Sequence, residues 1–102
     1  MIGHKDLTIR YPNDTPPHLA EALMKAATAV GEESRFGMRD GAVLDDHVPL
    51  NDAGIPTIDI IGDFTRFDWW HKDADNIGII SKESLDISIK VTRHMLDALL
   101  TE

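Results

Sequence analysis

A near-continuous apolar run from Ile55 to Ile61 constrains the fold of this 102-residue chain more than any other feature. The isoleucines do not alternate cleanly with polar residues, and this pattern is typical of a strand that is covered on both faces, as in the middle of a parallel sheet. Pro56 fits such a strand only at its start, because proline cannot donate to the ladder. The run therefore predicts a mostly parallel sheet that helices cover.

Two helical patterns flank this run. The first spans residues 16–30, where Thr15 is the expected N-cap, two prolines fit the first turn and Gly31 supplies a stop. The second spans residues 82–101, and we expect its apolar stripe to pack on the sheet. The stripe consists of Leu85, Ile89, Thr92, Leu96 and Leu99, widened by Ile87, Val91 and Met95.

The remaining segments predict shorter elements. Residues 5–11 indicate a short strand or an extended entry, residues 32–42 a loop or a short edge strand, and residues 48–54 a short helical turn. The long loop over residues 62–76 is rich in aromatic and charged side chains, and loops of this length are usually functional. The sequence thus predicts an α/β fold of one partial domain, residues 1–102, with an incomplete, mostly parallel sheet and two main helices.

Charge and composition exclude several classes of function. The formal net charge is -8 and no cluster of Lys and Arg occurs, which argues against nucleic acid as a partner. Cysteine is absent, so any metal must be bound by His, Asp and Glu. No apolar run approaches the roughly 20 residues of a membrane span, and no export signal is recognisable. We therefore expect a soluble chain that does not interact with membranes.

Two ionisable clusters bracket the isoleucine run. Asp45, Asp46 and His47 lie upstream of it, and Trp69-Trp70-His71 with Asp73 and Asp75 lies downstream. In open α/β sheets, ligands bind near the carboxyl ends of the strands, where such loops collect. Imidazole and carboxylate groups are the ligands of hydrolytic zinc sites. The spacing of Asp45, Asp46, His47 and His71 matches no local metal motif. His71 is therefore either a metal ligand or an ordinary loop histidine.

The acidic residues have alternative interpretations as well. Asp45 and Asp46 precede a predicted helical turn and could cap it, a role that is compatible with a site on neighbouring residues. Asp59 lies inside the apolar run, where an ionised carboxylate needs a partner. It either orients a histidine, with His47 as the plausible partner, or reaches water at the end of the strand. We expect Asp46, His47 and Asp59 to orient the residues that contact the metal or the substrate, without contacting either themselves.

Two tryptophans and three further histidines remain. Adjacent side chains of an extended segment point in opposite directions, so only one of Trp69 and Trp70 is expected to line a pocket, and Trp70 is the better candidate. His4, His18 and His94 occur in sequence contexts that are typical of the surface.

Four blocks of the sequence resemble the carboxyl-terminal half of the zinc-dependent aminopeptidase and glutaminyl cyclase superfamily. They are residues 41–50, residues 53–61, Trp70-His71 with Asp75, and residues 81–85. They follow one another in the family's order and spacing. The tryptophan directly before the histidine is more similar to the glutaminyl-peptide cyclotransferase branch than to the two-zinc aminopeptidases.

The resemblance implies a fold and a set of roles. It implies part of a phosphorylase/hydrolase-like three-layer sheet, with a peptide amino terminus as the substrate. His71 matches the last zinc ligand, Trp70 the wall of the substrate pocket, and Asp45 an acid of the proton network. In the complete family enzyme, zinc polarises the side-chain amide of a glutamine while carboxylates move protons from the attacking amine to ammonia.

The chain also departs from the family pattern. The family's other zinc ligands, its general-base Glu and a further catalytic Asp belong upstream of the matching region. Lys72 stands where the family usually has threonine, and Leu44 where some cyclases have a polar pocket residue. One histidine cannot hold zinc tightly, so we expect the isolated chain to be inactive. The alternative is a non-catalytic binding or assembly module. Because missing strands would leave edges and apolar faces open, we also expect a homo-oligomer.

Overall fold

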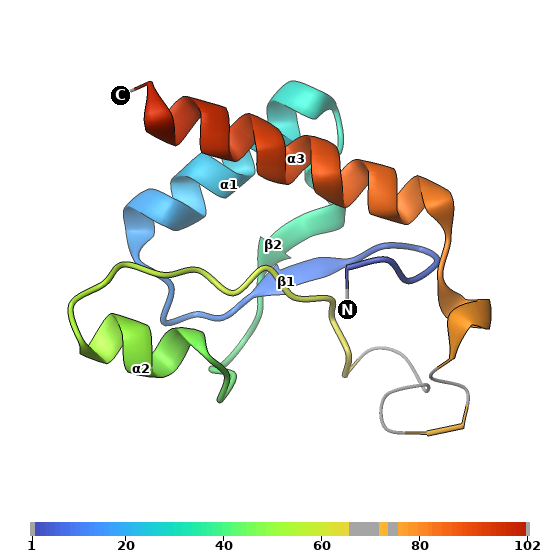
Figure 1. Cartoon of the computed structure of the whole chain (residues 1–102), viewed down its shortest axis with the longest axis horizontal. Coiled ribbons are helices and arrows are strands. Elements are labelled where there is room, and N and C mark those ends of the chain that lie inside the picture. Colours follow the sequence, from blue (N-terminus) through green and yellow to red (C-terminus); the bar gives the residue numbers. More distant parts are fainter. Residues whose placement is uncertain (1, 66–71, 74–75, 102) are drawn as a thin grey trace.

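In the computed structural model, which describes residues 2–65, 72–73 and 76–101, helices account for most of the regular structure (Figure 1). The strands are β1 (Ile9–Tyr11) and β2 (Phe36–Met38), and the helices are α1 (Pro17–Val30), α2 (His47–Asp52) and α3 (Lys82–Leu100). Short 3₁₀ turns cover Glu33–Arg35 and Ile77–Ile79.

The two strands form a parallel pair that is connected through α1. Ile9 is paired with Phe36, and Tyr11 with Met38. Helices α1 and α3 lie on one side of the strands, whereas α2 lies on the other (Figure 1). This arrangement confirms the predicted α/β class with two main helices around a small parallel sheet.

Helix α1 matches the predicted range, and its end is well defined by Gly31. This glycine adopts a left-handed conformation (φ 82°), and its N–H donates to the carbonyl of Thr28 at 3.0 Å. The predicted cap at the other end was wrong. The Thr15 hydroxyl donates to the carbonyl of Pro12 at 2.6 Å, and Pro16 takes the N-cap position without a side-chain hydrogen bond.

The core lies between β1 and the two long helices. Side chains from all three elements are buried in it, among them Ile9, Leu23 and Val91, each with an exposed fraction of 0%. Helix α3 begins at a capped end, because the Ser81 hydroxyl accepts a hydrogen bond from the Ser84 N–H at 3.1 Å. Within the described part of the chain, no helix has the length and apolar character needed to cross a membrane.

The predicted packing face of α3 was wrong in part. Ile87, Val91 and Met95 are buried and contact the core. The stripe expected to face the sheet lies mostly outside the core, since Ile89 and Leu96 are 59% and 53% exposed. The described chain therefore covers only one side of the wide apolar surface of α3.

The isoleucine-rich run does not form the predicted central strand. Ile55 is exposed, and both backbone groups of Thr57 bond to the side chain of Asn51 instead of to a neighbouring strand. Only the end of the run lies against β1, where the Arg10 N–H donates to the carbonyl of Ile61 at 3.0 Å. The run is an irregular segment that is partly buried beside the sheet.

The expectation that His4 lies at the surface was wrong. Its residue exposure is 2%, and its Nε2 accepts a hydrogen bond from the Thr8 N–H at 3.0 Å. Burial lowers the pKa of His4, because a charged imidazole is poorly solvated there. His18 and His94 are exposed as expected.

Candidate functional site

A buried histidine between two carboxylates forms the centre of the site. His47 is the first residue of α2, and its side chain is 1% exposed. Its Nε2 lies 3.4 Å from an Asp14 carboxylate oxygen, and its Nδ1 lies 3.6 Å from an Asp59 oxygen. Neither ring nitrogen has a hydrogen-bond partner within the described chain, so these contacts are electrostatic. An imidazole can donate to both carboxylates only when both nitrogens carry hydrogen.

Three separate segments meet at this histidine. Asp14 comes from the turn between β1 and α1, His47 from α2, and Asp59 from the isoleucine-rich run. Asn51 holds two of these segments together: its side-chain amide donates to the Thr57 carbonyl at 3.0 Å and accepts from the Thr57 N–H at 2.8 Å. The paired hydrogen bonds attach α2 to the segment that carries Asp59.

Two carboxyl groups next to this histidine have divergent proton affinities. Burial raises the pKa of Asp59 to about 6, and hydrogen bonding with Asp45 and the negative charge of Asp45 add to the effect. The pKa of Asp45 is lowered, chiefly because its Oδ1 accepts a hydrogen bond from the Asp46 N–H at 2.8 Å. Asp45 therefore holds its charge, while Asp59 retains a proton in mildly acidic solution.

The capping interpretation of the acidic pair fits only by position. Asp46 precedes α2 and occupies its N-cap, but its side chain makes no capping hydrogen bond. Instead the Asp46 backbone N–H is bound by the carboxylate of Asp45. The main effect of this contact is thus on the charge of Asp45.

The structure brings four of the predicted site residues together. Asp45 and Asp46 lead into His47, and Asp59 lies beside the imidazole. Asp14 was missed, because it belongs to a proline-rich turn with no sequence signal that links it to a distant histidine. Trp70 and His71 lie outside the described residues, and their roles stay predictions.

The described residues do not fit a metal site by themselves. No group of three His, Cys, Asp or Glu side chains able to hold a metal ion occurs among them. A catalytic zinc ion requires about three protein ligands.

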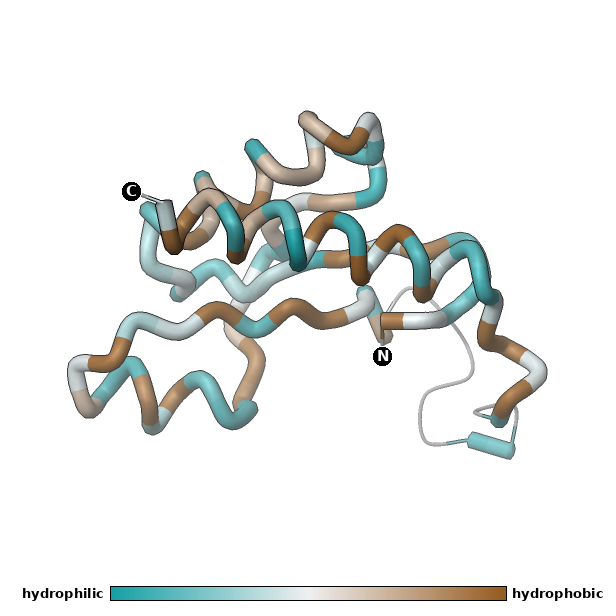
Figure 2. Tube along the Cα trace, turned by 45° about the horizontal axis from the view of Figure 1, so that its top comes forward, coloured by the Kyte–Doolittle hydropathy of each residue, from teal (hydrophilic) through white to brown (hydrophobic). Residues whose placement is uncertain are grey.

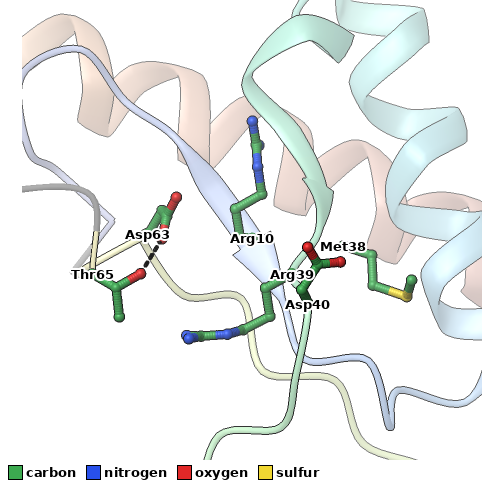
Figure 3. A pocket seen from close by; sticks show the side chains of 6 residues that line it. All are labelled: Arg10, Met38, Arg39, Asp40, Asp63 and Thr65. Atoms are coloured by element: carbon green, nitrogen blue, oxygen red, sulfur yellow. Dashed lines mark hydrogen bonds between the residues drawn. The ribbon is translucent and has the colours of Figure 1, made fainter.

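A polar pocket of about 320 Å³ lies where β2 ends (Figure 3). Arg39 projects toward the side where Asp63 and Thr65 lie, and these two side chains are hydrogen bonded at 3.0 Å. The Arg39 guanidinium lies 5.1 Å from the centre of the Phe64 ring, which holds it in place by a cation–π contact. The residues of this pocket are scattered along the chain, and no sequence pattern connects them.

A match to a protein-family model shows which family this chain belongs to. The model of peptidase family M28 matches residues 1–96. The chain belongs to peptidase family M28. This result confirms the resemblance to zinc aminopeptidases and glutaminyl cyclases that the sequence blocks indicated.

Solved structures of glutaminyl cyclases and of an aminopeptidase precursor share the fold. The glutaminyl cyclase of an Acidobacteriales bacterium has a TM-score of 0.85 and 30% identity over 96% of this chain. The glutaminyl cyclase of Porphyromonas gingivalis has a TM-score of 0.80 and 34% identity over 96% of it. A leucine aminopeptidase precursor from Bacteroides thetaiotaomicron VPI-5482 has a TM-score of 0.81 and 28% identity over 93%.

The chain spans only part of these M28 structures. It covers 36% of the Acidobacteriales cyclase, 40% of the Porphyromonas cyclase and 34% of the aminopeptidase precursor. Among curated proteins, none matches the chain significantly.

Proposed function

We propose that this chain is the carboxyl-terminal portion of a zinc-dependent glutaminyl cyclase-like enzyme, with aminopeptidase-like activity as the second possibility. The observation that carries the proposal is the Asp45–Asp59 carboxyl pair, supported by the buried His47, in a chain whose fold matches a glutaminyl cyclase. A proton-transfer network of this kind suits a reaction in which an amine loses a proton and ammonia leaves.

The two carboxyl groups have complementary parts in this proposal. Asp45 is exposed, and its lowered pKa keeps it charged, so it can accept the hydrogen bond that carries the proton of Asp59. Asp59 has a pKa of about 6 and is more buried, so it can hold a proton close to neutral pH. His47 lies 3.6 Å from Asp59 and limits the rise in the pKa of this carboxyl group. His47 is thus a positioning residue in this scheme.

The proposal assigns one zinc ligand to this chain, His71, and the others to the remaining part of an M28 domain. No group of three metal-binding side chains occurs among the described residues, and His71 lies outside them. Trp70 would form a wall of the substrate pocket. A peptide amino terminus is the expected substrate.

Two considerations favour a cyclase over an aminopeptidase. The cyclase structures are 30% and 34% identical to the chain, and the aminopeptidase precursor is 28% identical. The sequence also has Trp70 directly before His71, which resembles the cyclotransferase branch.

A chimeric enzyme tests the proposal. The matching region of the Porphyromonas cyclase is replaced by this chain, and ammonia release from a glutaminyl dipeptide is measured. We expect activity in the chimera, and a loss of at least about tenfold in kcat for Asp45→Asn, in line with the usual effect of a proton-transfer group. Asp52→Asn is the matched control, because Asp52 is an exposed acid at the opposite end of α2 from Asp45.

A folded chimera without activity would contradict the proposal, and so would an unaffected Asp45→Asn variant. Hydrolysis of a leucine anilide without ammonia release would indicate the aminopeptidase instead. We expect the isolated chain with added zinc to show no turnover. A third outcome is an inactive chimera together with an isolated chain that forms a stable homo-oligomer without stoichiometric zinc. This outcome would favour a non-catalytic binding or assembly module over part of an enzyme.

A further inference from the structure

Helix α3 carries a second apolar face that the described chain leaves uncovered. This outer stripe consists of Leu85, Ile89, Leu96 and Leu100, which are between 37% and 75% exposed. Figure 2 shows apolar segments recurring along α3 between polar ones. Part of the stripe lines an open groove of about 350 Å³, which is completed by Ile2, Ser88, Thr92 and Arg93. Exposed apolar surfaces of this kind mark contact sites.

The groove is a built surface, because the segment at its edge is fixed to α3. The Ser88 hydroxyl donates to the Ile2 carbonyl at 2.7 Å, and the Ser81 N–H donates to the Gly3 carbonyl at 2.9 Å. A Cβ atom on Gly3 would lie 2.6 Å from a methyl group of Leu85. Glycine at this position therefore lets the Ile2 side of the groove approach the helix.

The M28 relatives indicate what covers this face. Their structures match nearly the whole chain, yet the chain accounts for only 36% and 40% of the two cyclases. Most of each relative therefore lies outside the matched part and must pack against it somewhere. We propose that the outer stripe of α3, with Ile2, is the surface on which the remaining part of an M28 domain packs.

A second copy of the chain fits this surface less well. A symmetric pairing of the stripe from Leu85 to Leu100 would be centred near Arg93, and at the centre of a two-fold interface each residue meets its own copy. Two guanidinium groups would then repel each other beside an apolar surface. A non-identical polypeptide avoids this conflict.

The test compares one pair of substitutions in two contexts. Ile89→Glu with Leu96→Glu adds two negative charges to the stripe. Lys90→Glu is the control, because it changes the net charge by the same amount on the exposed, charged face of α3. Each variant is made in the isolated chain and in the chimera with the Porphyromonas cyclase, and thermal unfolding and sedimentation are measured.

We expect the stripe variant to lower the Tm of the chimera by on the order of 10 °C, because two charges become buried. In the isolated chain the same variant should shift the Tm by only a few degrees, as should Lys90→Glu in both contexts. Equal shifts in the two contexts would overturn the proposal, as would a wild-type chimera that does not fold. A dimer of the isolated chain that the stripe variant dissociates, together with an insensitive chimera, would assign the surface to a second copy. None of these readouts requires enzyme activity.

Discussion

The apolar core and the His47 cluster are held together by different forces. The core between β1, α1 and α3 buries Leu23 and Val91 completely, and its stability comes from apolar area that is removed from water. The cluster around α2, on the other side of the strands, contains one imidazole with two carboxyl groups, Asp14 and Asp59, at ion-pair distances. The core should therefore be insensitive to pH, whereas the cluster should respond to each change in ionisation.

The largest expected effect is in the core. Leu23→Ala removes a side chain with 0% exposure and should lower the free energy of unfolding by about 3 kcal/mol. Urea unfolding should give the same loss at about pH 5 and pH 7.5, since no ionisable group is involved. Leu44→Ala is the control, because Leu44 is 93% exposed and should change stability by less than about 0.5 kcal/mol. A loss that varies strongly with pH would break the contrast between core and cluster.

The next effect is in the cluster and has a defined sign. Because the pKa of Asp59 is raised from 3.8 to about 6, the folded chain binds this proton more tightly than the unfolded chain. The stabilisation is complete below about pH 4 and is lost as the pH rises to about 6, by roughly 1–3 kcal/mol.

Asp59→Asn mimics the protonated acid and removes this titration. Between about pH 4 and pH 7.5 the variant should therefore gain roughly 1–3 kcal/mol relative to the unmodified chain, as measured by urea unfolding at both pH values. A constant difference between the two proteins would show that Asp59 does not titrate in this range.

A smaller effect is expected at Asn51, which links α2 to the segment that carries Asp59. Asn51→Ala removes two hydrogen bonds to the backbone of Thr57 and should cost about 1–2 kcal/mol. It should also loosen the contact between His47 and Asp59, which NMR titration of the Asp59 carboxyl would detect as a pKa closer to the ordinary value. Asn13→Ala, at an exposed position in the turn before α1, is the control. An unchanged pKa of Asp59 in Asn51→Ala would show that these hydrogen bonds do not affect the carboxyl pair.

The smallest effect is expected at Asp14. Its side chain is 43% exposed, so Asp14→Asn should change the free energy of unfolding by only a few tenths of a kcal/mol. The change should shrink further in about 1 M salt, where exposed charges are screened. A larger effect that survives in salt would mean that Asp14 contributes to the cluster as much as Asp59 does.

The sequence was a good guide where a local pattern determines the structure. The spacing of apolar residues predicted α1 and α3 nearly to the residue, and Gly31 ends α1 as expected. The isoleucine-rich run was mistaken for a central strand, because the side chain of Asn51 takes the backbone groups of Thr57. A competing side-chain partner of this kind has no signature in an apolar pattern.

Tertiary packing decided what the local patterns left open. On α3, Val91 and Ile89 belong to adjacent apolar faces that look alike in the sequence, and only the position of β1 and α1 determines which one is buried. The residues of the site behave similarly. The run Asp45 to His47 was recognisable as a block in the sequence. Asp14 lies far from it in the sequence, and only the folding of the chain brings it to His47.

The paired hydrogen bonds of Asn51 have a mechanical consequence. They attach the short helix α2 to the segment that carries Asp59, so the two should rotate or shift as one body. If another polypeptide pressed on α2, the imidazole of His47 and the carboxyl group of Asp59 would travel together and keep their separation. The acidity of the pair would then survive a change in its orientation.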